Sequence, residues 1–87
     1  MTTLAATEPE VTRPGWVRCL GGWRWSPEPS IRGQVARTFN ARYSWALCRH
    51  VRFIDWQIVA DPGEETYETP DLAAEACERA QEEVADG

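Results

Sequence analysis

Four residues of this chain carry side chains that could bind a metal ion or take part in redox chemistry. They are Cys19, Cys48, His50 and Cys77. Together they could supply the Cys₃His ligand set of a zinc site, but such sites usually place cysteines in pairs roughly two to four residues apart. That spacing is absent here. We therefore predict small, mostly buried cysteines, with no disulfide framework and no bound metal.

Catalysis would require a nucleophile, a base and an acid that the fold brings together. The chain has one histidine and no lysine, and no serine or cysteine stands in a known nucleophile motif. Carboxylates are abundant, but most fall in a segment that is typical of a solvated helix face. The sequence thus predicts a protein that is not an enzyme and that uses no cofactor.

The charged residues are distributed unevenly along the 87-residue chain, whose net charge is −5. Up to residue 54, eight arginines outnumber three acidic residues, which sums to +5. From residue 55 onward one arginine stands against eleven acidic residues, which sums to −10. The molecule is therefore bipolar, and each charged region is a candidate interaction surface.

Residues 69–86 contain the clearest helix signals and most of the acidic surface. Thr69 is a good N-cap, Pro70 suits the first helical position, and Asp71 complements the positive helix end. An apolar stripe is expected to pack on the rest of the fold: Leu72, Ala76, Ala80 and Val84, widened by Ala73 and Cys77. The candidate partner-binding residues lie around the other side of the helix: Asp71, Glu75, Glu78, Glu82 and Glu83. Replacing the four glutamates with glutamine is expected to leave folding intact.

Arginines alternate with aromatic residues in an earlier part of the chain. Trp23-Arg24-Trp25 and the segment that begins at Arg42 have the composition of sheet-based nucleic-acid-binding proteins, which stack bases and contact phosphates. An alternative site for nucleic acid therefore consists of Trp23, Arg24, Trp25 and Arg42. The competing interpretation is that these arginines form the polar face of a half-buried sheet.

The elements that would position these side chains are strands followed by a helix. Residues 42–60 are dense in aromatic and β-branched residues at a period near two, which predicts two strands. Alternate residues share a face: Tyr43, Trp45 and Leu47 in the first strand, and Ile54, Trp56 and Ile58 in the second. We expect Trp45 and Trp56 both to be buried on the sheet.

The remaining segments complete a small α+β domain. Residues 1–13 are expected to be a flexible tail, and residues 14–87 a single domain. Residues 16–26 predict a hairpin that turns at Gly21-Gly22. Residues 30–40 fit either a strand or a short helix, with the strand slightly favoured. The predicted fold is an antiparallel sheet of three to four strands with one C-terminal helix packed on it.

Two resemblances bear on function. The order of elements, with Trp56-Gln57-Ile58 and Tyr67-Glu68-Thr69 before an alanine-rich helix, resembles the DNA-binding domains of plant AP2 factors and integrase arm-binding modules. In size, compactness and charge the chain is similar to small phage and prophage accessory proteins, including anti-CRISPR proteins. That likeness implies an inhibitor or adaptor whose acidic helix binds a basic protein surface, such as that of a nuclease complex. Independently, the odd cysteine count without a signal peptide predicts a cytoplasmic protein, and the absence of a long apolar run predicts no membrane segment.

Overall fold

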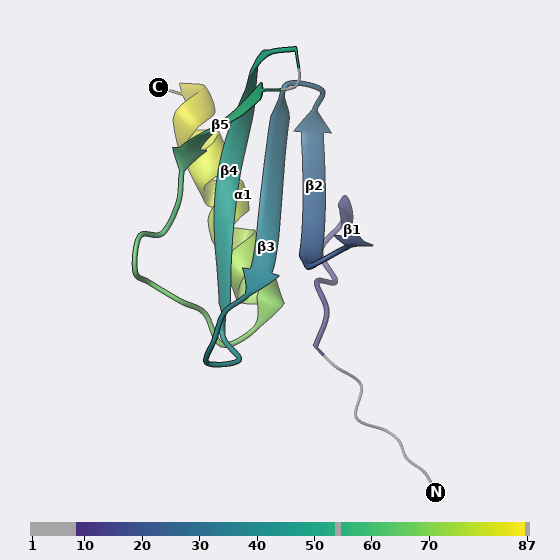
Figure 1. Ribbon diagram of the computed structural model, residues 1–87, viewed down its shortest axis with the longest axis vertical. Helices are drawn as coiled ribbons and strands as arrows, with labels where there is room; N and C mark the ends of the chain where they lie inside the picture. Colours follow the sequence, from purple (N-terminus) through teal and green to yellow (C-terminus); the bar gives the residue numbers. More distant parts are fainter. Residues whose placement is uncertain (1–8, 54, 87) are drawn as a thin grey trace, which may run out of the picture.

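Residues 9–53 and 55–86, which the computed structural model describes, form a five-stranded antiparallel sheet with one helix packed against it (Figure 1). The elements are β1 (Trp16–Cys19), β2 (Gly22–Glu28), β3 (Ile31–Arg37), β4 (Tyr43–Arg52), β5 (Asp55–Ala60) and α1 (Pro70–Asp86). The predicted α+β class is confirmed. The sheet has more strands than expected because the ambiguous segment supplies a full strand, β3.

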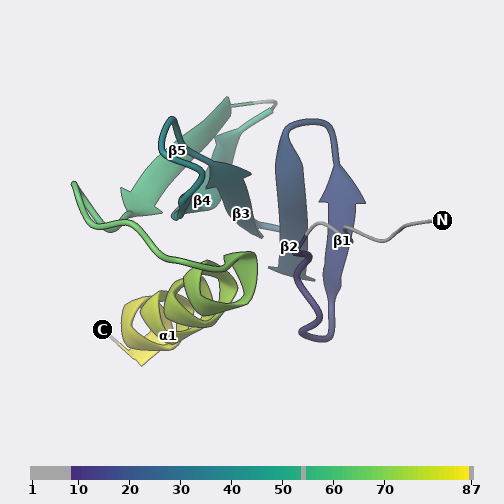
Figure 2. The same cartoon turned by 90° about the horizontal axis from the view of Figure 1, so that it is seen from below.

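Each strand pairs with the next one along the chain, so the sheet order is β1-β2-β3-β4-β5. Consecutive antiparallel pairs need only hairpin connections. The β3 strand is hydrogen-bonded on both sides, and Ile31, Gly33 and Val35 are buried at alternate positions along it. This pairing confirms the favoured strand interpretation of residues 30–40. The helix α1 lies across β3 and β4 on one side of the sheet (Figure 2).

The core lies between this side of the sheet and α1. Tyr43, Trp45 and Leu47 of β4 point toward it, as their spacing predicted, and Leu47 is fully buried. The other buried members are Trp16, Trp23, Ile31, Val35, Ala73, Ala74 and Cys77. Large side chains from the sheet thus meet small ones from the helix, which allows close packing of the two layers.

Gly33 permits the closest part of this packing. A Cβ at Gly33 would lie 2.8 Å from Cys77 Sγ and 2.9 Å from the Trp25 ring. Both distances are shorter than van der Waals contact, so a larger residue would displace one of these neighbours. Trp25 also stacks on Trp16, with ring centroids 5.6 Å apart.

The start of α1 follows the prediction, but its buried stripe does not. Thr69 Oγ1 accepts a hydrogen bond from the Leu72 backbone N–H at 3.2 Å, which confirms the N-cap. Leu72 itself is 46% exposed, whereas Ala73 and Ala74 are fully buried. The expected place of Leu72 in the buried stripe is therefore wrong. The tight approach of helix and sheet favours small residues at the contact.

The β1–β2 turn lies one residue earlier than predicted. Cys19 pairs with Gly22, so the loop residues are Leu20 and Gly21, and Gly21 has a φ of 88°. Gly22 belongs to β2, where a Cβ would lie 1.9 Å from the Val35 carbonyl oxygen. Gly21 therefore provides the left-handed backbone of the turn, and Gly22 allows β3 to approach.

Trp56 lies on the side of the sheet that faces away from α1. The register of β4 and β5 places it opposite His50, and places Ile58 opposite Cys48. Trp56 is half-buried and packs against the Arg32 side chain. The expectation that Trp56 is buried on the sheet, as Trp45 is, proves wrong, because strand pairing places it on the face that α1 leaves open. Ile54 lies outside the described residues.

The predicted tail is described only from residue 9 onward, and residues 1–8 lie outside the described range. Its boundary with the domain stays a prediction. Within the part of the chain that the structure describes, no helix is long and apolar enough to cross a membrane.

Candidate functional site

The acidic residues of α1 do not form one free surface, and Glu78 is the clearest exception. Its carboxylate accepts hydrogen bonds from Arg13 Nε at 2.9 Å and Nη2 at 2.8 Å, and from Trp16 Nε1 at 2.8 Å. The Arg13 hydrogen bonds, supported by the one from Trp16, hold the pKa of Glu78 below its ordinary value despite partial burial. The same contact raises the pKa of Arg13. Glu78 therefore stabilises the fold, and its replacement with glutamine should weaken folding, contrary to the expectation from the sequence.

Asp71 also binds the segment before β1. The Thr12 backbone N–H and Oγ1 each donate a hydrogen bond to its carboxylate at 2.7 Å. Together with Glu78, it fastens residues 12 and 13 to the helix. Both of these candidate partner-binding residues thus already have intramolecular partners.

The remaining candidate residues lie elsewhere around α1, namely Glu75, Glu82 and Glu83. Glu75 accepts a hydrogen bond from Arg79 Nη2 at 2.9 Å, one helical turn away. Glu82 and Glu83 are exposed to solvent. Glu83 and Glu75 both line a groove beside the helix, whereas Glu82 does not line it.

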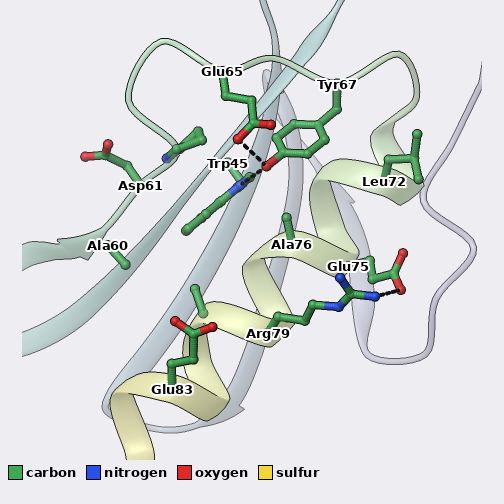
Figure 3. Close-up of a pocket in the computed structure, with 12 residues that line it drawn as sticks. Trp45, Ala60, Asp61, Glu65, Tyr67, Leu72, Glu75, Ala76, Arg79 and Glu83 are labelled. Carbon is green, nitrogen blue, oxygen red and sulfur yellow. Dashed lines mark hydrogen bonds and ion pairs between the residues drawn. The ribbon is translucent and has the colours of Figure 1, made fainter. Parts of the chain in front are cut away.

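This groove, of about 650 Å³, separates α1 from the segment that connects β5 to the helix (Figure 3). Trp45 and Ala76 contribute to its apolar lining, and Tyr67 stands on the opposite side from the helix. Its acidic residues come from both walls: Asp61 and Glu65 from the connecting segment, and Glu75 and Glu83 from α1. Arg79, the cationic residue in the lining, is already paired with Glu75.

Hydrogen bonds hold the connecting segment in place. Tyr67 forms an isolated bridge with Tyr43, with both backbone N···O distances at 2.8 Å. Trp45 Nε1 donates to Tyr67 Oη at 3.4 Å, and Tyr67 Oη donates to Glu65 Oε1, also at 3.4 Å. Arg42 donates to Thr66 Oγ1 at 2.6 Å and to its carbonyl oxygen at 3.0 Å. The Glu65 wall is therefore fixed with respect to the core.

The residues of the alternative nucleic-acid site are not brought together. Trp23 is buried on the α1 side, with its ring edge against Tyr43, and half-buried Trp25 faces the same side. Arg24, between them in β2, is exposed on the opposite face. Arg42 is used to hold the connecting segment.

Sequence reasoning missed a second cluster on the side of the sheet that α1 leaves open. The Arg32 guanidinium lies 4.0 Å from the ring centroid of Trp56, and the His50 ring lies 5.1 Å from the same residue. The three side chains come from β3, β4 and β5. The alternation of Arg32 with the buried residues of β3 was the available signal, because it places Arg32 on the opposite face.

The cysteines and the histidine are dispersed. Cys77 lies in the core, where burial raises its pKa to about 12, and burial also raises the pKa of Cys48. Cys19 is half-buried on β1. Across the described residues, no group of three or more His, Cys, Asp or Glu side chains is placed to hold a metal ion.

Comparison with protein-family models, with curated proteins and with solved structures found no match.

Proposed function

We propose that this protein is a non-enzymatic inhibitor or adaptor that binds a basic segment of a partner protein in the groove beside α1. The observation that carries this proposal is the lining of the groove, in which four carboxylates accompany one arginine that is already paired. A lysine or arginine side chain from a partner would find acceptors on both walls. Excess negative charge in a cleft also raises the local concentration of cationic partners.

The apolar lining suits the stems of the same side chains. Arginine and lysine carry apolar methylene chains below their charged heads, and these chains pack well on aromatic rings. Trp45 and Tyr67 offer such rings in the lining of the groove. A guanidinium near either ring would also gain from cation–π attraction.

This assignment changes the set of residues that the sequence predicted to contact a partner. Glu75 and Glu83 remain in it, Asp61 and Glu65 join it, and Glu78 is assigned to the fold. A partner of this kind is a protein whose basic surface otherwise binds nucleic acid, as the likeness to anti-CRISPR proteins suggests. The groove would compete with the phosphate backbone for that surface.

Titration calorimetry with an oligo-arginine peptide tests the proposal, with an oligo-glutamate peptide of equal length as the negative control. The test variant is Glu65→Gln combined with Glu83→Gln, which removes one carboxylate from each wall. The matched control is Glu68→Gln combined with Glu82→Gln, because both residues are exposed and lie outside the groove. The two variants have the same net charge.

We expect the groove variant to bind the arginine peptide about tenfold more weakly than the wild type, which corresponds to about 1.4 kcal/mol. The control variant should lose much less affinity. Equal losses in the two variants would mean that only the overall charge attracts the peptide, and the groove proposal would then fail.

A further inference from the structure

The side of the sheet that faces away from α1 is a second candidate surface, and it differs from the groove in charge. The helix covers only one side, as the view in Figure 2 shows. By register, Arg24 of β2 lies beside Gln34 of β3, and Arg32, two residues away on β3, lies beside Cys48 of β4. The smaller Ala36, Ser44 and Ala46 adjoin Gln34 on the same side. Trp56 lies farther along this face, opposite His50.

Arg32 and Trp56 form the aromatic part of this open face. The guanidinium lies 4.0 Å from the Trp56 ring centroid, and Trp56 also contacts His50 at 5.1 Å. Within the described residues, Arg32 Nε is buried without a hydrogen-bond partner. Stacking on Trp56 rather than pairing with a carboxylate therefore holds this cation, and its charge is not neutralised.

The lack of neutralisation extends to the rest of the open face. Among the described residues, neither Arg24 nor Arg32 forms an ion pair, although Arg13, Arg18 and Arg79 all do. The residues paired with these two arginines in the neighbouring strands are uncharged: Arg24 lies opposite Val17 and Gln34, and Arg32 lies opposite Cys48. In a chain with fourteen acidic residues, this face is locally basic.

We propose that the open face binds single-stranded nucleic acid, with phosphates at Arg24 and Arg32 and a base against the aromatic side chains of Trp56 and His50. Unpaired bases stack on aromatic rings and on guanidinium planes, while arginines contact the backbone. Charge complementarity favours a polyanion, and the rings of Trp56 and His50, which are tilted by 48° to each other, favour one that carries planar groups. This site lies on the opposite side of the sheet from the groove, so either proposal can fail alone.

Fluorescence anisotropy with a labelled oligothymidine of about 12 nucleotides tests the proposal. The test variant is Arg24→Gln combined with Arg32→Gln. The matched control is Arg37→Gln combined with Arg49→Gln, because both arginines are exposed and pair in register with core residues on the α1 side. Melting curves of both variants establish that they are folded, and Arg24→Gln alone replaces the pair if Arg32→Gln unfolds the protein.

The wild type should bind the oligonucleotide at low salt. The test variant should bind at least about tenfold more weakly, and its logarithmic salt slope should be smaller by about 1.4, since two phosphate contacts are lost. Trp56→Ala should weaken binding about fivefold or more through lost stacking. The control variant should change affinity much less than the test variant.

Three results would overturn the proposal. The first is no anisotropy change at low salt with wild-type protein. The second is an equal loss of affinity in the test and control variants. The third is displacement of the oligonucleotide by oligo-glutamate at equal charge concentration, which would indicate a general anion surface rather than a nucleic-acid site.

Discussion

Glu78→Gln should destabilise the protein, although Glu78 stands on a helix face that the sequence marks as solvated. The substitution keeps the shape of the side chain and one oxygen acceptor, but it removes the negative charge to which Arg13 and Trp16 donate their hydrogen bonds. The Glu78 side chain is 21% exposed and that of Arg13 is 36% exposed. This pair is therefore neither fully buried nor free in water.

The expected cost follows from that partial exposure. Hydrogen bonds to charged groups contribute roughly 1.5–3 kcal/mol, whereas exposed ion pairs contribute about 0–1 kcal/mol. An intermediate site should lose about 1–2 kcal/mol of unfolding free energy. For a domain of this size, that corresponds to a Tm decrease of roughly 5–15 °C.

The pH dependence gives an independent check on the same contact. Because the Arg13 hydrogen bonds hold the pKa of Glu78 below its ordinary value, the contact stabilises the fold above the unfolded-state pKa of about 4.3. It is lost as the pH falls through the lower pKa of the folded state. The stability difference between wild type and Glu78→Gln should therefore be largest near neutral pH and should shrink in acid.

Thermal and urea unfolding at several pH values measures these quantities. Glu82→Gln is the matched control, because Glu82 is exposed on the same helix, and it should change stability by less than about 0.5 kcal/mol. A double-mutant cycle with Arg13→Gln should return a favourable coupling energy between Arg13 and Glu78. If Glu78→Gln has the same melting temperature as Glu82→Gln and the wild type, the contact between Arg13 and Glu78 does not stabilise the fold, and our reasoning is wrong.

Three further predictions concern the core. Trp45→Ala should lower the unfolding free energy by about 3–5 kcal/mol, because Trp45 is buried against α1. Trp56→Ala should lower it clearly less, because Trp56 is half-buried on the open face. Urea unfolding of the two variants compares these losses. Gly22→Ala should prevent expression of soluble folded protein, because the added Cβ would lie 1.9 Å from the Val35 carbonyl oxygen. Gly21→Ala should lower the unfolding free energy by only about 1–2 kcal/mol, because the substituted residue must adopt a positive φ. Cys77, with its pKa raised to about 12, should react with a thiol reagent only on unfolding, and mass spectrometry of the native labelled protein checks this.

Much of the fold was accessible from local sequence signals. Alternation in residues 42–60 predicted β4 and β5, and Thr69 with Pro70 predicted the start of α1. These signals act within one element, so no knowledge of its neighbours is needed. Leu72 shows the limit, because the choice between Leu72 and Ala73 as the buried residue depends on how closely the helix approaches Gly33.

The same limit applies to the residues of the candidate site. Glu75 and Glu78 lie three residues apart on one helix, yet Glu75 lines the groove while Glu78 binds Arg13. Helical periodicity could not separate them, because the difference arises from a segment 65 residues earlier in the chain. Asp61 and Glu65 were missed since their segment has no periodicity that would indicate which way it faces.

The arginine and tryptophan residues show what strand parity could have revealed earlier. In a strand, Trp23 and Trp25 must face one side and Arg24 the other, so the Trp-Arg-Trp sequence cannot form one stacking surface. The pairing of Arg32 with Trp56 depends instead on the register of three strands, including the shift between Leu47 and Cys48. No local pattern specifies that register.

Local charge, rather than net charge, therefore governs what each surface can bind. A net charge of −5 argues against nucleic acid only if the whole chain acts as one charge. At physiological ionic strength the Debye length is about 8 Å, and the shortest dimension of the molecule is 21 Å. Carboxylates on the outer side of α1 are thus largely screened from Arg24 and Arg32 on the open face. An acidic groove and a basic sheet face can then operate on one small domain, each with a partner of opposite charge.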